Sequence, residues 1–246
     1  MDNLPTTVSG DIHPAPTQTS RPIPSTLTPA PAAQTSVPPA SPSPTFSPTS
    51  EVSCHLCSPL AEHEISELSE IVSDPYDPPP PGKDDRHQGV DFAYYRRGER
   101  ASIEGEGVMA ILPGRVASSM NNRLPYGNML IIETSRSDLP PGIIHAVDID
   151  PGQSLYHLYA HLAAPPQVTV GDWVACGQLL GEVGKTGYNI PIPHLHLETR
   201  IGPADSVFES MVFYDTRATE DEMYNYRWWR MSGEFRHFDP MILFDE

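Results

Sequence analysis

The stretch PHLHLE, residues 193–198, alternates histidine with leucine and ends on an acidic residue. In an extended chain, alternate side chains point to the same side. His194 and His196 would therefore share one face of a strand, with Leu195 and Leu197 on the other. The chain has only ten histidines, so two of them on one face of an apolar strand raise the question of a functional site.

Short apolar runs, separated by Gly, Pro and Asn, precede this stretch along the chain. This pattern favours strands over helices. We predict a mostly β fold, a single antiparallel β-sandwich or open barrel with few short helices. The predicted strands lie within residues 89–95, 107–119, 128–135, 143–149, 154–162, 172–184 and 194–201.

The clearest helical signal lies near the C-terminal end, in TEDEMYNYRWWRM, residues 219–231. Thr219 and Glu222 have the spacing of a capping box, in which each side chain accepts a hydrogen bond from the other residue's backbone N–H. Trp228 and Trp229 could line a groove, but the core face of an amphipathic helix is the more common place for them.

Composition divides the chain into three parts. Residues 1–50 are almost entirely Pro, Thr, Ser and Ala, and we expect a disordered spacer because such a segment buries too little apolar area to fold. Residues 51–83 read as a helix at 58–72 followed by a Pro-rich connector, together a possible pro-segment. The folded domain is predicted to span 84–246, with a C-terminal extension from about residue 202.

The charge balance and the apolar runs exclude several classes of partner. The net charge is −17 and the only lysines are Lys83 and Lys185, so a nucleic-acid partner is not expected. No run is long enough to predict a transmembrane helix, and the start lacks the charged and apolar regions of a signal peptide.

The three cysteines form no zinc-finger pattern. Cys54 and Cys57 make a single C-x-x-C, and Cys176 stands alone. A structural zinc site needs a second pair of ligands at similar spacing. A local disulfide or free thiols are therefore predicted in preference to a metal.

Four histidines fall in three short motifs, and their number suits a hydrolase. His87 lies four residues before Asp91 in HQGVDF, His161 lies in YAHL, and His194 and His196 form the HLH pair. A hydrolytic zinc site uses three protein ligands and keeps one position open, and amide hydrolysis also needs groups that move protons and stabilise an oxyanion. Surface or hydrogen-bonding roles are expected for the remaining histidines: His13, His55, His63, His145, His157 and His237.

These motifs resemble those of the lysostaphin-type zinc endopeptidases, which cut peptide bonds in bacterial peptidoglycan. The resemblance covers residues 84–201: HQGVDF resembles the family's H-x-x-x-D motif, HLYAHL its central histidine motif and HLHLE its H-x-H motif. The glycine-punctuated stretch 168–187 and the Asp-Pro pair at 239 and 240 also resemble family features.

The resemblance implies a zinc site and a division of roles among these residues. His87, Asp91 and His196 would bind zinc, and His161 and His194 would be catalytic residues that do not bind it. It also implies peptidoglycan peptides as substrate, an extracytoplasmic location and a monomer.

The chain departs from the family pattern in three places. YNIPIP, residues 188–193, replaces a short turn of small residues before H-x-H, the stretch 134–152 is longer than usual, and residues 202–234 extend the C-terminal side. These departures bear on substrate choice more than on the chemistry.

Two other interpretations remain open. The stretch 170–184 also resembles the hairpins of biotinyl and lipoyl carriers, with Lys185 as the lysine to be modified, but a carrier leaves the four histidines unexplained. Alternatively the chain is a non-catalytic or autoinhibited wall-binding or regulatory module. In that case residues 51–83 would block the site, with Cys54 or His55 as the blocking group.

Overall fold

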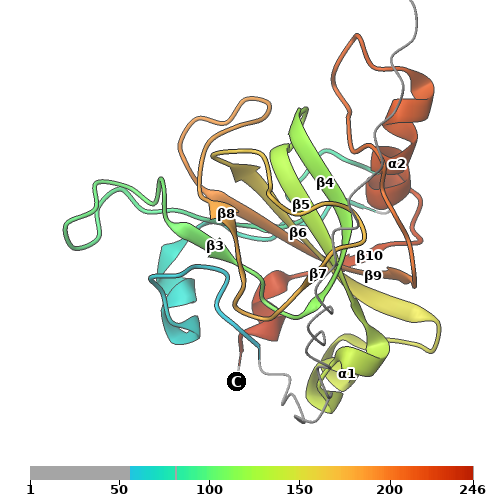
Figure 1. The fold of residues 1–246 in the computed structure, drawn as a ribbon, viewed down its shortest axis with the longest axis horizontal. Coiled ribbons are helices and arrows are strands. Elements are labelled where there is room, and N and C mark those ends of the chain that lie inside the picture. The colour runs from blue at the N-terminus through green and yellow to red at the C-terminus, as the bar shows by residue number, and fades with distance from the viewer. Residues whose placement is uncertain (1–55, 81, 246) are drawn as a thin grey trace, which may run out of the picture. The chain divides into compact units, whose positions relative to one another are not determined.

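The computed structural model of the protein describes residues 56–80 and 82–245. The predicted spacer 1–50, together with Cys54 and His55, lies outside these residues. The HLH stretch leads into strand β9 (Leu195–Pro203), which lies inside the main sheet. The strand order of this sheet is β1-β2-β9-β6-β5-β4-β7, with β10 also paired to β9, and every pair of neighbours is antiparallel. Figure 1 shows the two α-helices well apart, with α2 at the upper right of the picture and α1 at the lower right.

The remaining elements range from two-residue β7 to twelve-residue α2. The other strands of the main sheet are β1 (Val72–Asp74), β2 (Val90–Phe92), β4 (Gly114–Arg123), β5 (Gly127–Ser135), β6 (Gln153–Leu162), β7 (Trp173–Val174) and β10 (Arg236–Phe238). A second, two-stranded sheet pairs β3 (Gly107–Met109) with β8 (Leu179–Glu182). The helices are α1 (Pro141–Val147), α2 (Glu220–Met231) and the 3-10 helices η1 (Ile65–Ile71), η2 (Arg136–Asp138) and η3 (Pro240–Leu243).

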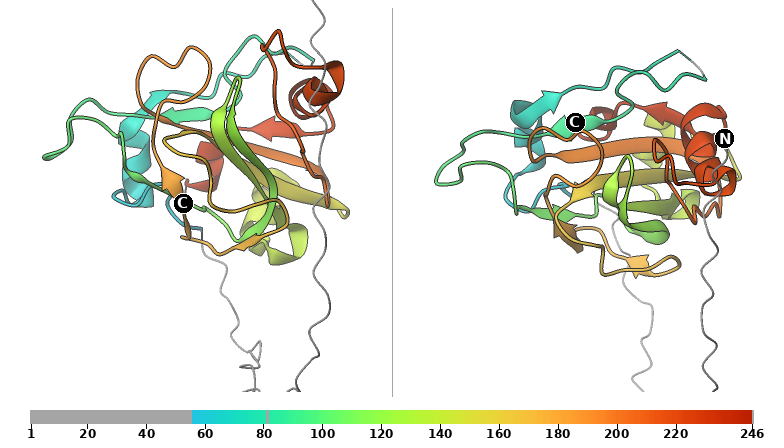
Figure 2. Two further views of the ribbon diagram at one scale, coloured as in Figure 1. Left: turned by 45° about the horizontal axis from the view of Figure 1, so that its top comes forward. Right: turned by 90° about the horizontal axis from the view of Figure 1, so that it is seen from above.

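Both faces of the main sheet are buried, because apolar side chains alternate between two clusters. Leu130 and Ile132 of β5 belong to the larger cluster, whereas Met129 and Ile131 belong to the smaller one. Residues of the β3–β8 sheet pack in the larger cluster. The smaller cluster contains Trp229 of α2 and other aromatic residues of the C-terminal extension. In Figure 2 the turned views show β3 and β8 beside the main sheet.

The predicted fold class is confirmed, since residues 56–80 and 82–245 are mostly antiparallel β, with few helices and no closed barrel among them. The predicted helix at 219–231 is also confirmed: α2 begins after Thr219, whose hydroxyl accepts from the Glu222 N–H while the Glu222 carboxylate accepts from the Thr219 N–H at 2.9 Å. Trp229 is fully buried, as expected for the core face of this helix. Among the described residues, no helix has the length and apolar character needed to cross a membrane.

Two local predictions were wrong. Residues 143–149 were predicted as a strand, but most of them lie in α1. A short apolar run does not distinguish strand from helix, and Pro141 in the first turn favours the helix. The helix predicted at 58–72 is a 3-10 helix that begins only at Ile65. Its cap is a capping box between Glu64 and Glu67 and not Ser58.

Residues 56–80, which we call the front strap, pack as part of the domain. Leu60, Leu68 and Ile71 are buried in the larger cluster, and β1 pairs with β2. The domain was predicted to begin at residue 84, whereas the structure already includes the front strap in the core. The apolar spacing of residues 60–72 is the sequence feature that indicates this burial, although it predicts only a helix and not where the helix packs.

A disulfide joins the front strap to the rest of the domain. Cys57 is bonded to Cys176, 119 residues away in sequence. The predicted local bond or free thiols are therefore wrong for these two cysteines. The lone position of Cys176 in the sequence gave no sign of the pairing, because only the fold brings the two residues together.

Candidate metal centre and catalytic site

His87, Asp91 and His196 each bring one potential metal-ligand atom close to the other two. Nε2 of His87 lies 3.1 Å from Oδ1 of Asp91 and 3.0 Å from Nδ1 of His196, and these last two atoms are 2.7 Å apart. The sheet register explains the meeting, because Asp91 of β2 lies directly opposite His196 of β9. Gly89 permits the close approach: a Cβ there would lie 2.5 Å from the Leu197 carbonyl oxygen.

Hydrogen bonds on the far side of each imidazole set its tautomer. Nδ1 of His87 lies 3.0 Å from the Pro75 carbonyl oxygen and can only donate to it, which leaves the Nε2 lone pair facing the cluster. Nε2 of His196 lies 3.1 Å from Oε1 of Glu198, which leaves Nδ1 facing the cluster. Outer partners of this kind orient the histidine ligands of metal sites.

The cluster requires positive charge and has the ligand types that zinc uses. Two imidazole lone pairs and a carboxylate oxygen at these distances repel one another unless a cation lies among them. Burial alone would lower the pKa of His196, but the Asp91 and Glu198 carboxylates raise this pKa to about 9, so a proton is drawn to the same place. Two nitrogens and one oxygen suit zinc. His87, Asp91 and His196 are also the group of described residues whose ligand atoms could together hold a metal ion.

His161 and His194 lie beside this cluster, and each has its Nδ1 bound to a backbone carbonyl oxygen. Nδ1 of His161 donates to the Thr186 carbonyl oxygen at 2.8 Å, and Nδ1 of His194 donates to the Ile192 carbonyl oxygen at 2.9 Å. Their ring centroids are 4.8 Å apart. Nε2 of His194 lies 3.4 Å from Oδ2 of Asp91. Burial, with the nearby imidazoles of His196 and His194, lowers the pKa of His161 to about 3, so this ring is neutral near pH 7.

A break in strand alternation brings His161 to the site. Tyr159 and Leu162 of β6 both lie in the larger cluster, although strict alternation would place residues three apart on opposite faces. The register of β6 with β5 shifts here, and His161 has a φ of 65°, in the left-handed region. This bulge turns the imidazole toward His196, at a ring-centroid distance of 5.7 Å.

Glu198 anchors the site from behind and was assigned no role in the sequence analysis. Its side chain is fully buried, and Arg200 and Arg230 hold its pKa well below the usual range in spite of burial, which acts in the opposite direction. It lies two residues after His196 on a strand, so the alternation of β9 could have placed both on one face. Its carboxylate accepts hydrogen bonds from five side chains: Tyr126, His196, Arg200, Trp229 and Arg230.

The site opens into a cleft of about 560 Å³ lined by all five motif residues. The same cleft is lined by side chains that lie outside the motifs, among them Tyr188, Tyr214 and Arg230. A larger hollow of about 1080 Å³ is lined by Ile65, Ile143 and Phe244 among others and contains none of the motif histidines. Size therefore does not identify the functional site here.

Three of the histidines outside the motifs have other partners. Nδ1 of His63 lies 2.7 Å from Oε1 of Glu106, and His157 lies within hydrogen-bonding distance of Thr134 and Tyr159. His237 contacts the hydroxyl of Tyr76 at 2.6 Å, and His145 lies on α1. His13 and His55 lie outside the described residues.

The sequence model of peptidase family M23 matches residues 85–207, which is half of the chain. The chain belongs to peptidase family M23. The matched residues include all five motif residues of this M23 peptidase, whereas the front strap and α2 lie outside the match. No curated protein matches the chain.

Similar solved structures include two catalytic domains. A mutant of the catalytic domain of the prophage-encoded M23 protein EnpA from Enterococcus faecalis is 22% identical, with a TM-score of 0.40, over 62% of this chain and 89% of that one. The catalytic domain of the antimicrobial peptidase lysostaphin from Staphylococcus simulans is 27% identical, with a TM-score of 0.39, over 57% and 87%. A zinc-containing peptidase from Vibrio cholerae is 23% identical, with a TM-score of 0.36, over 52% and 32%.

Proposed function

We propose that this M23 peptidase is a zinc-dependent endopeptidase that hydrolyses peptide bonds in bacterial peptidoglycan outside the cytoplasm. The observation that carries the proposal is the meeting of His87, Asp91 and His196 beside two further histidines whose Nδ1 atoms are held by backbone carbonyls. Family membership supports a peptidase, and the motif resemblance supports zinc and peptidoglycan. The Cys57–Cys176 disulfide supports an oxidising compartment.

The metal ligands and the two other histidines have separate roles in this proposal. His87, Asp91 and His196 would hold the metal, and zinc bound there supplies a Lewis acid that polarises the scissile carbonyl and makes water more acidic. Neutral His161 presents the Nε2 lone pair because its Nδ1–H is occupied by Thr186, so it can accept a proton from water. His194 can carry a proton on Nε2 next to Asp91 and donate it to the oxyanion or the leaving amine.

A digest of purified peptidoglycan tests this function. The protein is incubated with the wall polymer with and without a chelator, and the released fragments are identified by mass and by their new termini. New amino termini that appear only with metal present support the proposal and identify the bond. The His161→Ala protein is the matched control, because it should bind zinc but release little. Fragments released equally with the chelator present, or new reducing sugar ends in place of amino termini, would overturn the proposal.

A further inference from the structure

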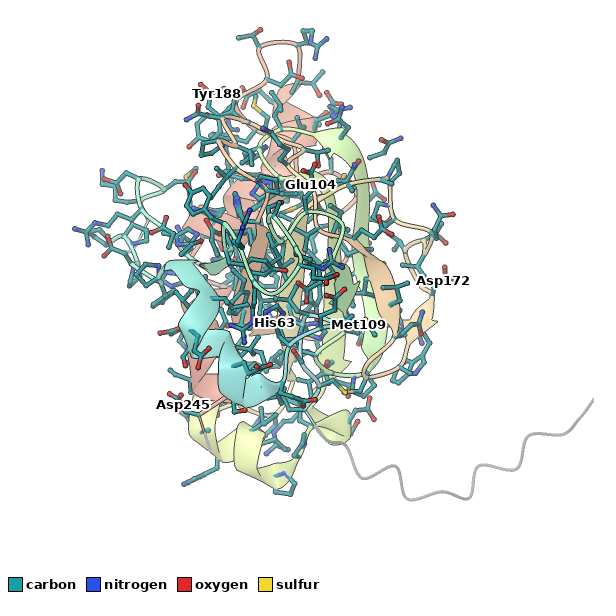
Figure 3. All side chains as sticks on the ribbon, turned by 90° about the vertical axis from the view of Figure 1, so that its left-hand side faces the viewer. His63, Glu104, Met109, Asp172, Tyr188 and Asp245 are labelled. Carbon is teal, nitrogen blue, oxygen red and sulfur yellow. A yellow bond between two sulfur atoms is a disulfide. The ribbon has the colours of Figure 1, made fainter. Side chains whose placement is uncertain are left out.

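Two exposed tyrosines lie together on the rim of the cleft. Tyr188 is 58% exposed and Tyr214 is 52% exposed, and both line the cleft with the site histidines. Their ring centroids are 6.1 Å apart and their planes lie within 24° of parallel. Figure 3 shows Tyr188 at the end of the molecule opposite to Asp245, whose side chain borders the larger hollow. The pair therefore belongs to the catalytic cleft.

The two rings come from the two places where the chain departs from the family pattern near the site. Tyr188 opens YNIPIP, which replaces the short turn before H-x-H, and Tyr214 belongs to the extension beyond the family match at residue 207. Tyr188 and Tyr214 are 26 residues apart in sequence, and their rings meet at the rim of the cleft. The family match therefore accounts for the catalytic residues but not for this aromatic pair.

Tyr214 is fixed in place although half of it is exposed. Its hydroxyl donates to Oδ2 of Asp84 at 2.9 Å, and that carboxylate is also bound by Tyr226 at 2.7 Å and by Arg230. The ring packs against Phe213, with centroids 4.7 Å apart. An aromatic ring that is held rigid and left open to solvent loses little entropy when a ligand contacts it.

The backbone beneath both rings is strained in the same way. Tyr214 has a φ of 55° and Asn189, directly after Tyr188, has a φ of 56°. Left-handed backbone at residues other than glycine is uncommon and is concentrated at functional sites. The Tyr188 N–H donates to the Pro125 carbonyl oxygen at 2.9 Å, which fixes the start of this loop.

Charge on the cleft lining indicates what the rings can bind. Among the described residues that line it, Asp74 has an exposed carboxylate, with 64% of its side chain accessible, whereas the Arg230 side chain is only 9% exposed. Tyrosine faces attract cations through their ring quadrupole. A lining of aromatic rings and an open carboxylate favours a peptide that carries an ammonium group over one that carries a free carboxylate.

We propose that Tyr188 and Tyr214 form an aromatic platform that binds an amino-bearing segment of the substrate peptide beside the metal centre and so determines which peptides are cut. This inference rests on the proposed function. Because the platform would hold a substrate segment other than the scissile bond, its loss should act on KM and leave kcat nearly unchanged.

The test compares single and double alanine variants of the two tyrosines on one pair of peptides. The probes are a synthetic peptidoglycan stem peptide that contains lysine and the same peptide with the lysine amine acetylated. We expect Tyr188→Ala and Tyr214→Ala each to raise KM for the free-amine peptide roughly two- to tenfold, with kcat within about twofold. Tyr188→Phe should remain near the parent, and the exposed Tyr95→Ala, away from the cleft, is the matched control.

Binding to a metal-loaded His161→Ala protein, measured by calorimetry, separates this inference from the proposed function. Tighter binding of the free-amine peptide than of the acetylated one, with the preference lost in the double tyrosine variant, supports the platform whether or not the parent shows turnover. Equal affinity for both peptides, or an unchanged affinity in the double variant, overturns it. Parental zinc content in each variant shows that the variant is folded. We expect it to be, because Asp84 keeps Tyr226 and Arg230 as hydrogen-bond partners when Tyr214 is replaced.

Discussion

Deleting the front strap decides whether it is a detachable inhibitor or part of the folded domain. A chain that begins at residue 84 lacks the buried side chains of Leu60, Leu68 and Ile71 and the disulfide of Cys57. It also lacks the Pro75 carbonyl oxygen that orients His87. An inhibitory segment would leave a folded and more active enzyme when removed. The packing predicts the opposite outcome.

The size of the loss can be worked from the structure. Each of the three buried side chains contributes roughly 1.5–3 kcal/mol, which gives about 5–9 kcal/mol in total. A disulfide that closes a loop of 119 residues contributes about 4–5 kcal/mol in the chain-entropy account. Small domains have unfolding free energies of only about 5–15 kcal/mol. The truncated chain should therefore be largely unfolded and inactive.

Two finer variants keep this prediction testable if the truncated chain cannot be purified. Leu68→Ala should lower the unfolding free energy by about 2–5 kcal/mol in denaturant melts. The exposed neighbour Ser69→Ala should change it by less than about 0.5 kcal/mol. Deleting residues 1–50 is the matched deletion, and it should leave melting temperature and turnover on soluble peptides unchanged, because that composition forms no core. A chain starting at residue 84 that melts like the parent and cuts faster would refute the reasoning.

Three further predictions concern the histidines and Asp91. Asp91→Asn should weaken zinc binding strongly, because the site loses its only charged ligand; a parental affinity in chelator competition would remove Asp91 from the ligand set. His196→Ala should lose zinc and thermal stability together, whereas His194→Ala and His161→Ala should keep zinc and lose on the order of a hundredfold or more in rate; metal loss in His194→Ala instead would reverse the assignment. Burial lowers the pKa of His157 to about 3 from an ordinary 6.5. Between these values the unfolded chain binds a proton that the folded chain does not. Stability is therefore fully present above pH 6.5 and falls with decreasing pH by up to about 1.4 kcal/mol per unit. His157→Gln should flatten that slope in unfolding measurements, and an unchanged slope would point to another group.

Local pattern was sufficient to predict the strand that carries His196, the proposed metal ligand. The alternation of HLHLE requires that His194 and His196 share a face, and the structure places Glu198 on that face as well. The spacing of His87 and Asp91 likewise indicated a common direction. Neither pattern could show that Asp91 lies opposite His196, because register between strands more than 100 residues apart is a tertiary property.

Features that depend on tertiary contacts were not predicted. Alternation along 154–162 would direct His161 away from the site, and only the bulge in β6 turns it back. The pairing of Cys57 with Cys176 depends on where the front strap packs. The apolar run at 143–149 suits a strand or a helix equally, and of the local signals only Pro141 favours the helix that forms.

The front strap and α2, which lie outside the family match, both contribute contacts behind the two proposed ligand histidines. The orientation of these histidines therefore depends on parts of the chain that the motifs do not include. An imidazole with a free outer nitrogen can rotate and exchange tautomers, so a ligand histidine needs a fixed outer acceptor. For His87 that acceptor is a backbone carbonyl of the front strap. For His196 it is Glu198, which is itself held by Trp229 and Arg230 of α2. The matched half of the chain contains the proposed ligand and catalytic residues, but their orientation depends on segments that the family motifs do not specify.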